Sequence, residues 1–355
     1  MAVLTEEQTM LRDMAREWAD NESPVTAFRK MRDAAPVAFY DAEAWRAQAE
    51  MGWAGILVPE AQGGVGMGTL SLGLVLEQLG RTLTATPLAA TAAATSAILL
   101  GGSEKQQAEW LPRIAAGEVV ATLAIDEGPR FAPDRIATEA GNGRITGTKE
   151  FVAEGDSAQL FVVAAKDGLY LVSGEEGVTR SPRRLADSRS HAQLRFDNAP
   201  AEKLEGRADL LTAVTDRAAA ASCAEMLGMA EAAFAQTNDY LKTRVQFGQL
   251  LASFQALQHR MARMFTELEL MRSVVEGAFE AIDADRDVSQ AVSLAKAVAG
   301  ETLQLVSREM VQLHGGIGMT DEHDAGFYLK RARVLEAMWG NAAWHRERFA
   351  RLNGY

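Results

Sequence analysis

Two segments in the second half of the chain are the most informative in the sequence. Residues 244–262 read RVQFGQLLASFQALQHRMA, and residues 311–323 read VQLHGGIGMTDEH. A diphosphate group is held by fixed cations and by backbone N–H donors, which an arginine and a Gly-Gly turn can supply. The two segments therefore predict an anion-binding region formed by the C-terminal part of the chain.

Working outward from these segments, the chain from residue 208 onward has a helical pattern. Apolar residues recur at steps of four and three and draw one stripe along a helix, namely Leu257, Met261, Met264, Leu268, Met271 and Val275. We interpret this Met-rich stripe as core rather than as a binding surface. Long helices with short connections predict an antiparallel, four-helix bundle.

The preceding stretch has a different periodicity. Asn142-Gly143 and Asp167-Gly168 are typical hairpin turns, and residues 193–197 alternate between polar and apolar. Upstream of it the pattern is helical again and begins at Thr5, whose spacing to Gln8 predicts a capping box. The sequence thus predicts an α+β protein of three domains: an N-terminal helical domain (1–117), a middle β domain (118–205) and a C-terminal helical bundle (206–355).

Composition excludes several classes of function. The chain has 355 residues and a net charge of −12, which disfavours binding to nucleic acid or to an anionic membrane face. Its single cysteine, Cys223, allows neither an internal disulfide nor a thiolate zinc cage, and no histidine pair has metal-ligand spacing. No apolar run is suited to span a bilayer. The sequence predicts a soluble, cytoplasmic protein without a metal site.

The two opening segments, in this order after a β block, resemble the C-terminal domain of the acyl-CoA dehydrogenase family. Residues 59–64 (PEAQGG) fit the family's N-terminal helical domain, and the three-block order fits its α–β–α architecture. The resemblance implies FAD in a cleft shared by two subunits. It further implies that an R-x-x-F-G arginine and a Q-x-x-G-G turn reach the diphosphate and adenosine end of the neighbour's FAD. The matching residues are Arg244, Phe247, Gln255, Gln312, Gly315 and Gly316.

The catalytic base of the family has no counterpart at either of its two usual positions. Dehydrogenation of an acyl-CoA thioester needs a carboxylate that removes the α-proton while a hydride leaves for the flavin. The family takes this glutamate from a Y-E-G-T motif near the C-terminus or from the helix before R-x-x-F-G. Here Trp339 occupies the first position and Ala218 the second.

The middle domain also departs from the family. A T-E-P-x-x-G-S-D loop and a W-I-T-N strand hold the flavin ring of a family member's own FAD. The corresponding stretches here are DEGPRFAPD (126–134) and FVAE (151–154). The hydroxyls and the tryptophan are lost, and the acidic Asp126 stands near the place of an electron-rich ring.

The resemblance therefore points to a partner subunit that completes another chain's flavin site. We hypothesise the base-less subunit of an α2β2 heterotetramer of the kind that degrades steroid-CoA side chains in bacteria. The implied ligands are FAD and an acyl-CoA thioester, and the implied partners are a second acyl-CoA dehydrogenase subunit and an electron-transfer flavoprotein. Three alternatives stay open. They are a homotetrameric dehydrogenase whose base is displaced to Glu336, Glu225 or Asp216, a flavin monooxygenase of the same fold, and a structural or CoA-binding subunit without redox function.

Overall fold

The computed structural model describes residues 4–35 and 39–355, which form two compact units. The helical unit comprises the described residues up to 27 together with 73–84 and 222–355. The β unit comprises the described residues of 28–72 together with 85–221. The long helix α7 (Leu210–Thr243) begins in the β unit and ends in the helical unit.

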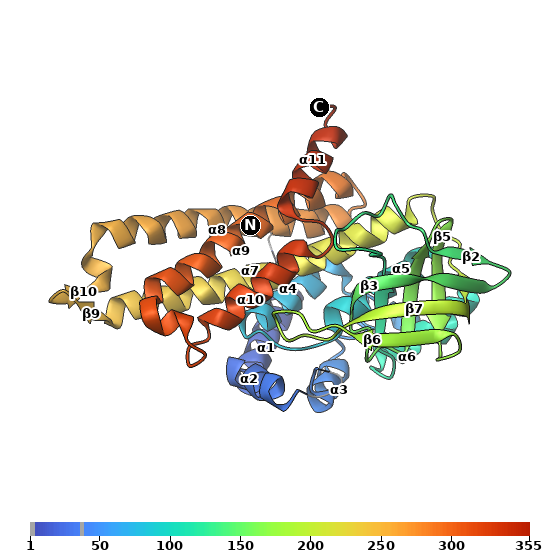
Figure 1. Ribbon diagram of the computed structural model, residues 1–355, viewed down its shortest axis with the longest axis horizontal. Helices are drawn as coiled ribbons and strands as arrows, with labels where there is room; N and C mark the ends of the chain where they lie inside the picture. The colour runs from blue at the N-terminus through green and yellow to red at the C-terminus, as the bar shows by residue number, and fades with distance from the viewer. Residues whose placement is uncertain (1–3, 36–38) are drawn as a thin grey trace. The chain divides into compact units, whose positions relative to one another are not determined.

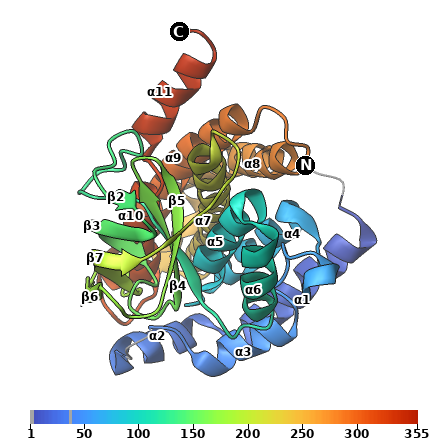
Figure 2. The ribbon, with the colours of Figure 1, turned by 90° about the vertical axis from the view of Figure 1, so that its right-hand side faces the viewer.

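The β unit contains two four-stranded sheets (Figure 2). One sheet has the order β1-β4-β5-β8 and the other the order β2-β3-β7-β6. Within each sheet neighbouring strands are antiparallel, except that β1 runs parallel to β4. The strands are β1 (Ala121–Ala124), β2 (Glu139–Gly141), β3 (Arg144–Ala153), β4 (Leu160–Ala165), β5 (Gly168–Ser173), β6 (Val178–Pro182), β7 (His191–Pro200) and β8 (Glu202–Lys203).

The predicted hairpin turns are confirmed. Asn142 and Gly143 have φ of 53° and 70° and connect β2 to β3, while Asp167 and Gly168 connect β4 to β5. The alternation at 193–197 is confirmed as well, since Leu194 and Phe196 of β7 are buried between exposed or half-buried neighbours. Phe196 meets Phe161 of β4 edge to face at 6.3 Å, so these side chains join the two sheets into one core.

Helices complete the β unit. Helix α5 packs against β1 and β4, and α6 packs against α5 (Figure 2). Trp45 donates its indole N–H to the carbonyl of Gly117 at 3.0 Å, which fastens α3 to the chain just before β1. The helices are α2 (Val25–Ala34, which begins in the helical unit), α3 (Ala42–Glu50), η1 (Glu60–Gln62), α5 (Leu88–Gly101) and α6 (Glu104–Ala115).

The helical unit is organised around α9, which packs against α8, α10 and α11 (Figure 1). The predicted stripe faces the core on α8, where Met264, Leu268, Met271 and Val275 are buried, whereas Leu257 and Met261 near its start are half-buried. The elements are α1 (Glu6–Glu22), α4 (Gly68–Arg81, from residue 73), β9 (Val245–Gln246), β10 (Gln249–Leu250), η2 (Leu251–Ser253), α8 (Gln255–Asp283), α9 (Val288–His314), η3 (Gly315–Met319), α10 (Ala325–Ala337) and α11 (Ala342–Leu352).

Helix α4 crosses α7 with backbone almost in contact. A Cβ added to Gly228 would lie 1.8 Å from the carbonyl oxygen of Glu77, and one added to Gly80 would lie 2.4 Å from that of Glu225. Only glycine fits such a crossing.

The predicted capping box at Thr5 is confirmed at the start of α1. Among the described helices, none is long and apolar enough to cross a membrane.

Candidate functional site

The R-x-x-F-G segment forms a short hairpin that projects from the end of α7 (Figure 1). β9 and β10 pair through Gln246–Gln249 and Val245–Leu250, and Phe247 and Gly248 make the turn with φ of 53° and 80°. Phe247 is 90% exposed, and its ring lies edge to face with that of Phe254 at 6.2 Å. An aromatic side chain so exposed on a tight hairpin is available for contact with another molecule.

Arg244 stands at the base of this hairpin. Its backbone is fixed, because its N–H donates to the carbonyl of Tyr240 and its carbonyl accepts from Leu251, both at 2.9 Å. Its side chain is exposed, and across residues 4–35 and 39–355 no carboxylate or carbonyl pairs with the guanidinium. Arg244 therefore presents a free cation on a fixed backbone.

The Gly-Gly turn lies at the C-terminal end of α9. Gly315 has a φ of 66°, which favours glycine, whereas Gly316 has no such requirement. A Cβ added to either residue would meet no described atom within 4 Å. Packing within the chain therefore gives no reason for glycine at 316, and the surface there is open to a close approach by something outside the chain.

Tyr240 and His314 bring the arginine and the Gly-Gly turn to the same end of the helical unit. The ring of Tyr240, one helical turn before Arg244, stacks on that of His314, the residue before Gly315, with centroids 4.4 Å apart. The ring of His323 also lies against that of His314, with centroids 4.3 Å apart. Burial lowers the pKa of His314, whose Nδ1 lies 2.7 Å from the carbonyl of Met310. The sequence offered no signal for Tyr240, because the contact is between residues 74 positions apart.

The two glutamines of the predicted site are also exposed. Gln255 is the first residue of α8, and Gln312 lies in the last turn of α9 beside Gly315. The contact of Tyr240 with His314 thus brings Arg244 and the Gly-Gly turn to the same end of the helical unit. Phe247 lies on the nearby hairpin, and the side-chain amides of Gln255 and Gln312 are accessible. An exposed cation, glycine backbone and amide side chains fit a diphosphate and adenosine group approaching from outside this chain.

Trp339, which the resemblance places at the first family position of the base, lies in the turn between α10 and α11. Its φ is 57°, an uncommon conformation for a bulky residue, and Gly340 follows with a φ of 93°. Two buried side chains hold this turn. Lys296 of α9 donates to the carbonyls of Leu335, Glu336 and Gly340 at 3.0, 3.4 and 3.0 Å, and His345 Nε2 lies 2.9 Å from the carbonyl of Trp339.

Burial sets the charge state of both residues that hold the turn. It lowers the pKa of Lys296 to about 8 and that of His345 to about 3, and the positive charge of Lys296 adds to the second shift. His345 is therefore neutral at physiological pH. The role of Lys296 was not predicted from the sequence. Its signal is a lysine within the Ala-rich stretch of residues 295–299, because lysine is rarely found on a buried helix.

The candidates for a displaced base are engaged in other contacts. Glu225 makes a bidentate ion pair with Arg331 at 2.8 and 2.9 Å, and both side chains are largely buried. Glu336 accepts from Arg333 and from Gln304, each at 3.0 Å. Ala218, which the resemblance places at the second family position, is buried and carries no titratable group, while Asp216 is buried two residues before it.

Two acids follow strands of the β unit in the stretches that the resemblance matches to the family's flavin-ring loops. Asp126 follows β1 and Glu154 follows β3, and the side-chain Oδ1 of Asp126 is buried with no hydrogen-bond partner among the described residues. Burial raises the pKa of Asp126 to about 6, although the Lys149 ammonium opposes the shift. A flavin ring presents hydrogen-bond acceptors along its edge, so an unpaired carboxylate does not fit it.

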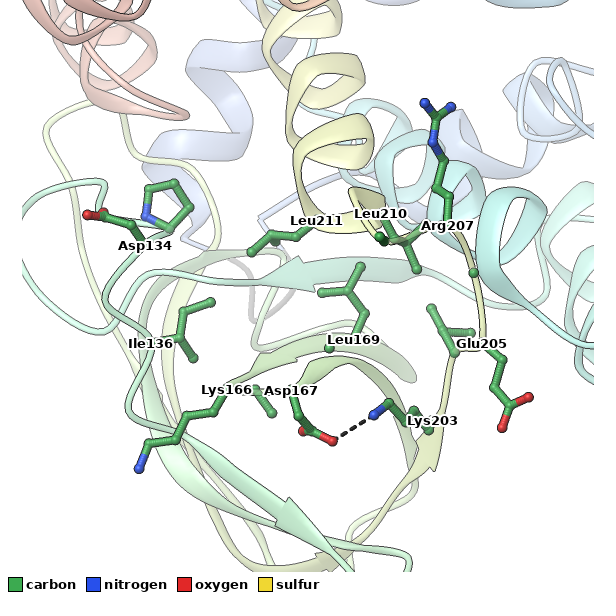
Figure 3. A pocket seen from close by; sticks show the side chains of 16 residues that line it. Asp134, Ile136, Lys166, Asp167, Leu169, Lys203, Glu205, Arg207, Leu210 and Leu211 are labelled. Atoms are coloured by element: carbon green, nitrogen blue, oxygen red, sulfur yellow. Dashed lines mark hydrogen bonds and ion pairs between the residues drawn. The ribbon is translucent and has the colours of Figure 1, made fainter.

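A separate cavity of about 550 Å³ opens in the β unit where the β4–β5 turn meets the start of α7 (Figure 3). Its lining includes Ile136, Leu169 and Leu211, and its rim carries Lys203 paired with Asp167 at 2.7 Å. Lys166 and Arg207 on the same rim pair with Glu139 and Asp209. None of the site residues predicted from the sequence lines it, and its cations are already neutralised.

Comparison with known proteins identifies the chain's relatives. The N-terminal domain model of acyl-CoA dehydrogenases matches residues 5–118, and the C-terminal domain model of the same enzymes matches residues 206–352. The chain is 33% identical over 298 residues to the acyl-CoA dehydrogenase IpdE2 of Mycobacterium tuberculosis, covering 82% of this chain and 81% of that protein. It is 31% identical over 338 residues to IpdE2 of Mycolicibacterium smegmatis, covering 95% and 96%.

Two solved structures are similar over nearly their whole length. One is the Tcur3481–Tcur3483 steroid ACAD G363A variant, with a TM-score of 0.92, 30% identity and 98% coverage of both chains. The other is the ChsE4–ChsE5 complex from Mycobacterium tuberculosis, with a TM-score of 0.92, 26% identity and full coverage of both chains. The matching domains, the sequence relatives and the shared fold agree, and the chain belongs to the acyl-CoA dehydrogenase family.

Proposed function

We propose that this chain is the non-catalytic subunit of a heteromeric, FAD-dependent acyl-CoA dehydrogenase, and that it completes the flavin site of a partner subunit. The observation that carries the proposal is an asymmetry within the chain. The residues that would reach a neighbour's FAD, above all Arg244 and Gly316, are exposed and unconstrained by their own chain. The β unit, by contrast, carries an unpaired acid where its own flavin ring would lie.

The absence of a base supports the same assignment. A dehydrogenase must hold a carboxylate against the α-carbon of the thioester. Trp339 and Ala218 stand at the two positions that the family uses, and Glu225 is bound within a buried ion pair with Arg331. Arg331 holds both carboxylate oxygens of Glu225, so this side chain is not free to reach the α-carbon of a thioester. These observations disfavour the homotetramer with a displaced base.

The similar structures support a two-component assembly and a substrate class. One is named as a steroid ACAD with two chain names, and the other as a complex of two chains. By extension, the partner here is a second acyl-CoA dehydrogenase subunit that carries the base, and the substrate is the CoA thioester of a steroid side chain. The electron acceptor is an electron-transfer flavoprotein, and the protein acts in the cytoplasm.

In the assembled protein, FAD would supply the acceptor for the hydride. The contribution of this chain is to bind and orient the far end of the cofactor. Arg244 would supply charge to the diphosphate, the Gly315-Gly316 backbone would supply N–H donors, and Gln312 and Gln255 would supply amide contacts. Phe247 contributes apolar surface on the hairpin.

Substitution of Arg244 tests this assignment. Arg244→Ala removes the free cation, and we expect the FAD content of the co-purified complex to fall at least fivefold, because a charge-assisted contact to phosphate contributes about 1.5–3 kcal/mol. The ratio of absorbance at 450 nm to protein concentration measures this content. Arg195→Ala, on an exposed part of β7, is the control and should leave the ratio unchanged. An unchanged ratio in Arg244→Ala would remove the main support for a site completed in trans.

A further inference from the structure

The loop after β1 lies against β3. Thr122 of β1 donates its hydroxyl to the carbonyl of Ala153 at 2.6 Å, and the N–H of Glu150 donates to the backbone carbonyl of Asp126 at 2.7 Å. The contacts pair 122 with 153 and 126 with 150, so the two segments run in opposite directions. Asp126 is therefore fixed beside Glu150 of β3.

The neighbouring acid, Glu127, is fully satisfied. It accepts from Lys149 at 2.7 Å, from the hydroxyl and N–H of Thr138 at 2.5 and 2.9 Å, and from the N–H of Ala137 at 2.6 Å. Burial works to raise the pKa of Glu127, but these hydrogen bonds hold it at about 2. Glu127 is thus ionised and structural.

Asp126 has no such support. The ammonium of the fully buried Lys149 is occupied by Glu127 and by the carbonyl of Ile125 at 3.1 Å, so it does not pair with Asp126. On β3, Glu150 beside Asp126 is engaged with Arg183 and Gln193. The buried Oδ1 of Asp126 has no partner among the described side chains and backbone groups. The loop thus holds one polar atom that is buried and unused.

We propose that Asp126 keeps a flavin ring out of this chain's own β unit, and that it does so only while its carboxyl is ionised. This inference rests on the proposed function and adds the residue responsible and its dependence on protonation. An ionised carboxyl is only an acceptor, as is most of the edge of an oxidised flavin ring, and its charge opposes the charge that the ring gains on reduction. A protonated carboxyl is a hydrogen-bond donor and removes both conflicts.

The charges around Asp126 agree with this behaviour. The charged groups beside it are Lys149 and Glu150, both from β3. Lys149 is paired with Glu127, and Glu150 is paired with Arg183. Because the pKa of Asp126 is raised to about 6, its carboxyl changes charge between pH 5 and pH 8. At pH 8 the carboxyl is charged, and at pH 5.5 it is mostly neutral.

Flavin binding by the chain alone tests the proposal. The variants are Asp126→Asn, which keeps the shape and removes the charge, and Asp126→Thr, which installs the residue of the family loop. Asp197→Asn, an exposed acid on β7 outside this loop, is the control. FAD affinity is measured by quenching of flavin fluorescence at pH 5.5 and pH 8, with unfolding curves to check that each variant is folded.

The expected result has three parts. The unsubstituted chain and Asp197→Asn bind FAD at least fivefold more tightly at pH 5.5 than at pH 8. At pH 8 both Asp126 variants bind at least fivefold more tightly than the unsubstituted chain. Between the two pH values their affinity changes less than twofold.

Two results would overturn the proposal. One is that the Asp126 variants bind FAD as the unsubstituted chain does at both pH values, including the case in which none of them binds it. The other is that the pH dependence persists in Asp126→Asn. Neither result bears on the partner-subunit function, which is read from the flavin content of the unsubstituted chain. A full flavin in that chain when it is purified alone at pH 8 would contradict both.

Discussion

Lys296 shows how one buried residue can hold the backbone of a turn. Its ammonium is fully buried on α9 and donates to two carbonyls near the end of α10 and to that of Gly340 in the turn, while His345 contacts the carbonyl of Trp339 in the same turn. Carbonyls at a helix end have no partner within the helix, and a buried cation is a strong partner for them. Lys296 thereby stabilises the turn that keeps Trp339 at a φ of 57°.

Replacing Lys296 by methionine tests this role. Lys296→Met keeps the length of the side chain but leaves two or three buried carbonyls unpaired, so we expect the free energy of unfolding to fall by about 3 kcal/mol. Urea unfolding of the chain at pH 7 measures the change. Lys242→Met, on an exposed position of α7, serves as the control. Equal stability of Lys296→Met and the unsubstituted chain would show that the turn is stable without the hydrogen bonds from Lys296.

At this scale the sequence predicted residue types better than contacts. The motif residues could be assigned from spacing and resemblance, and Cys223 is the buried filler that its apolar surroundings predicted, with burial raising its pKa to about 12. The partners of Lys296 lie 39–44 positions away, and the stack of Tyr240 on His314 joins two different helices. Such contacts depend on tertiary packing, which local patterns do not encode.

Among the elements, the hairpins show what local sequence can and cannot predict. The turns at Asn142-Gly143 and Asp167-Gly168 were predicted because asparagine, aspartate and glycine tolerate positive φ. The β9–β10 hairpin was not predicted, because its turn uses Phe247 at a φ of 53° and its strands have two residues each. A phenylalanine in this conformation, with its side chain 90% exposed, is better explained by a contact outside the chain than by local preference.

The junction of α4, α7 and α8 contains a second buried acid with an unusual pKa. Glu77 of α4 and Glu231 of α7 both contact Arg272 of α8, and Gln78 donates to Glu77 at 3.1 Å. Burial raises the pKa of Glu77 to about 7, and the charge of Glu231 adds to the shift. The folded state therefore holds a proton on this cluster that the unfolded chain releases at a lower pH.

This shift predicts how stability depends on pH. Since the pKa of Glu77 is raised from about 4.5 to about 7, stability falls as pH rises through that window. Glu77→Gln cannot ionise, and we expect it to be more stable than the unsubstituted chain by about 1–3 kcal/mol at pH 8 and equal to it near pH 5. Thermal unfolding at both pH values measures the difference. Glu269→Gln, which removes an exposed acid from the same arginine, should show no such crossover, and a Glu77→Gln variant that is less stable at pH 8 would contradict the prediction.

For the whole molecule, the α+β fold and its order of helices, sheets and helices follow from the sequence pattern, and the family comparisons agree with them. The boundaries at 117 and 205 remain predictions. The compact units do not follow chain order, since residues 73–84 pack with the C-terminal helices, and α7 belongs to both units. Sequence periodicity locates elements along the chain, whereas the α4–α7 crossing depends on Gly228 and Gly80 meeting another helix.

The central claim is that this chain completes a partner's flavin site and does not hold a flavin of its own. The most direct test is the molar ratio of flavin to protein at pH 8, for the chain purified alone and for the chain co-purified with a second acyl-CoA dehydrogenase subunit. The account predicts little flavin in the chain alone and about one FAD for each pair of unlike subunits. One FAD per chain in the protein purified alone would contradict it.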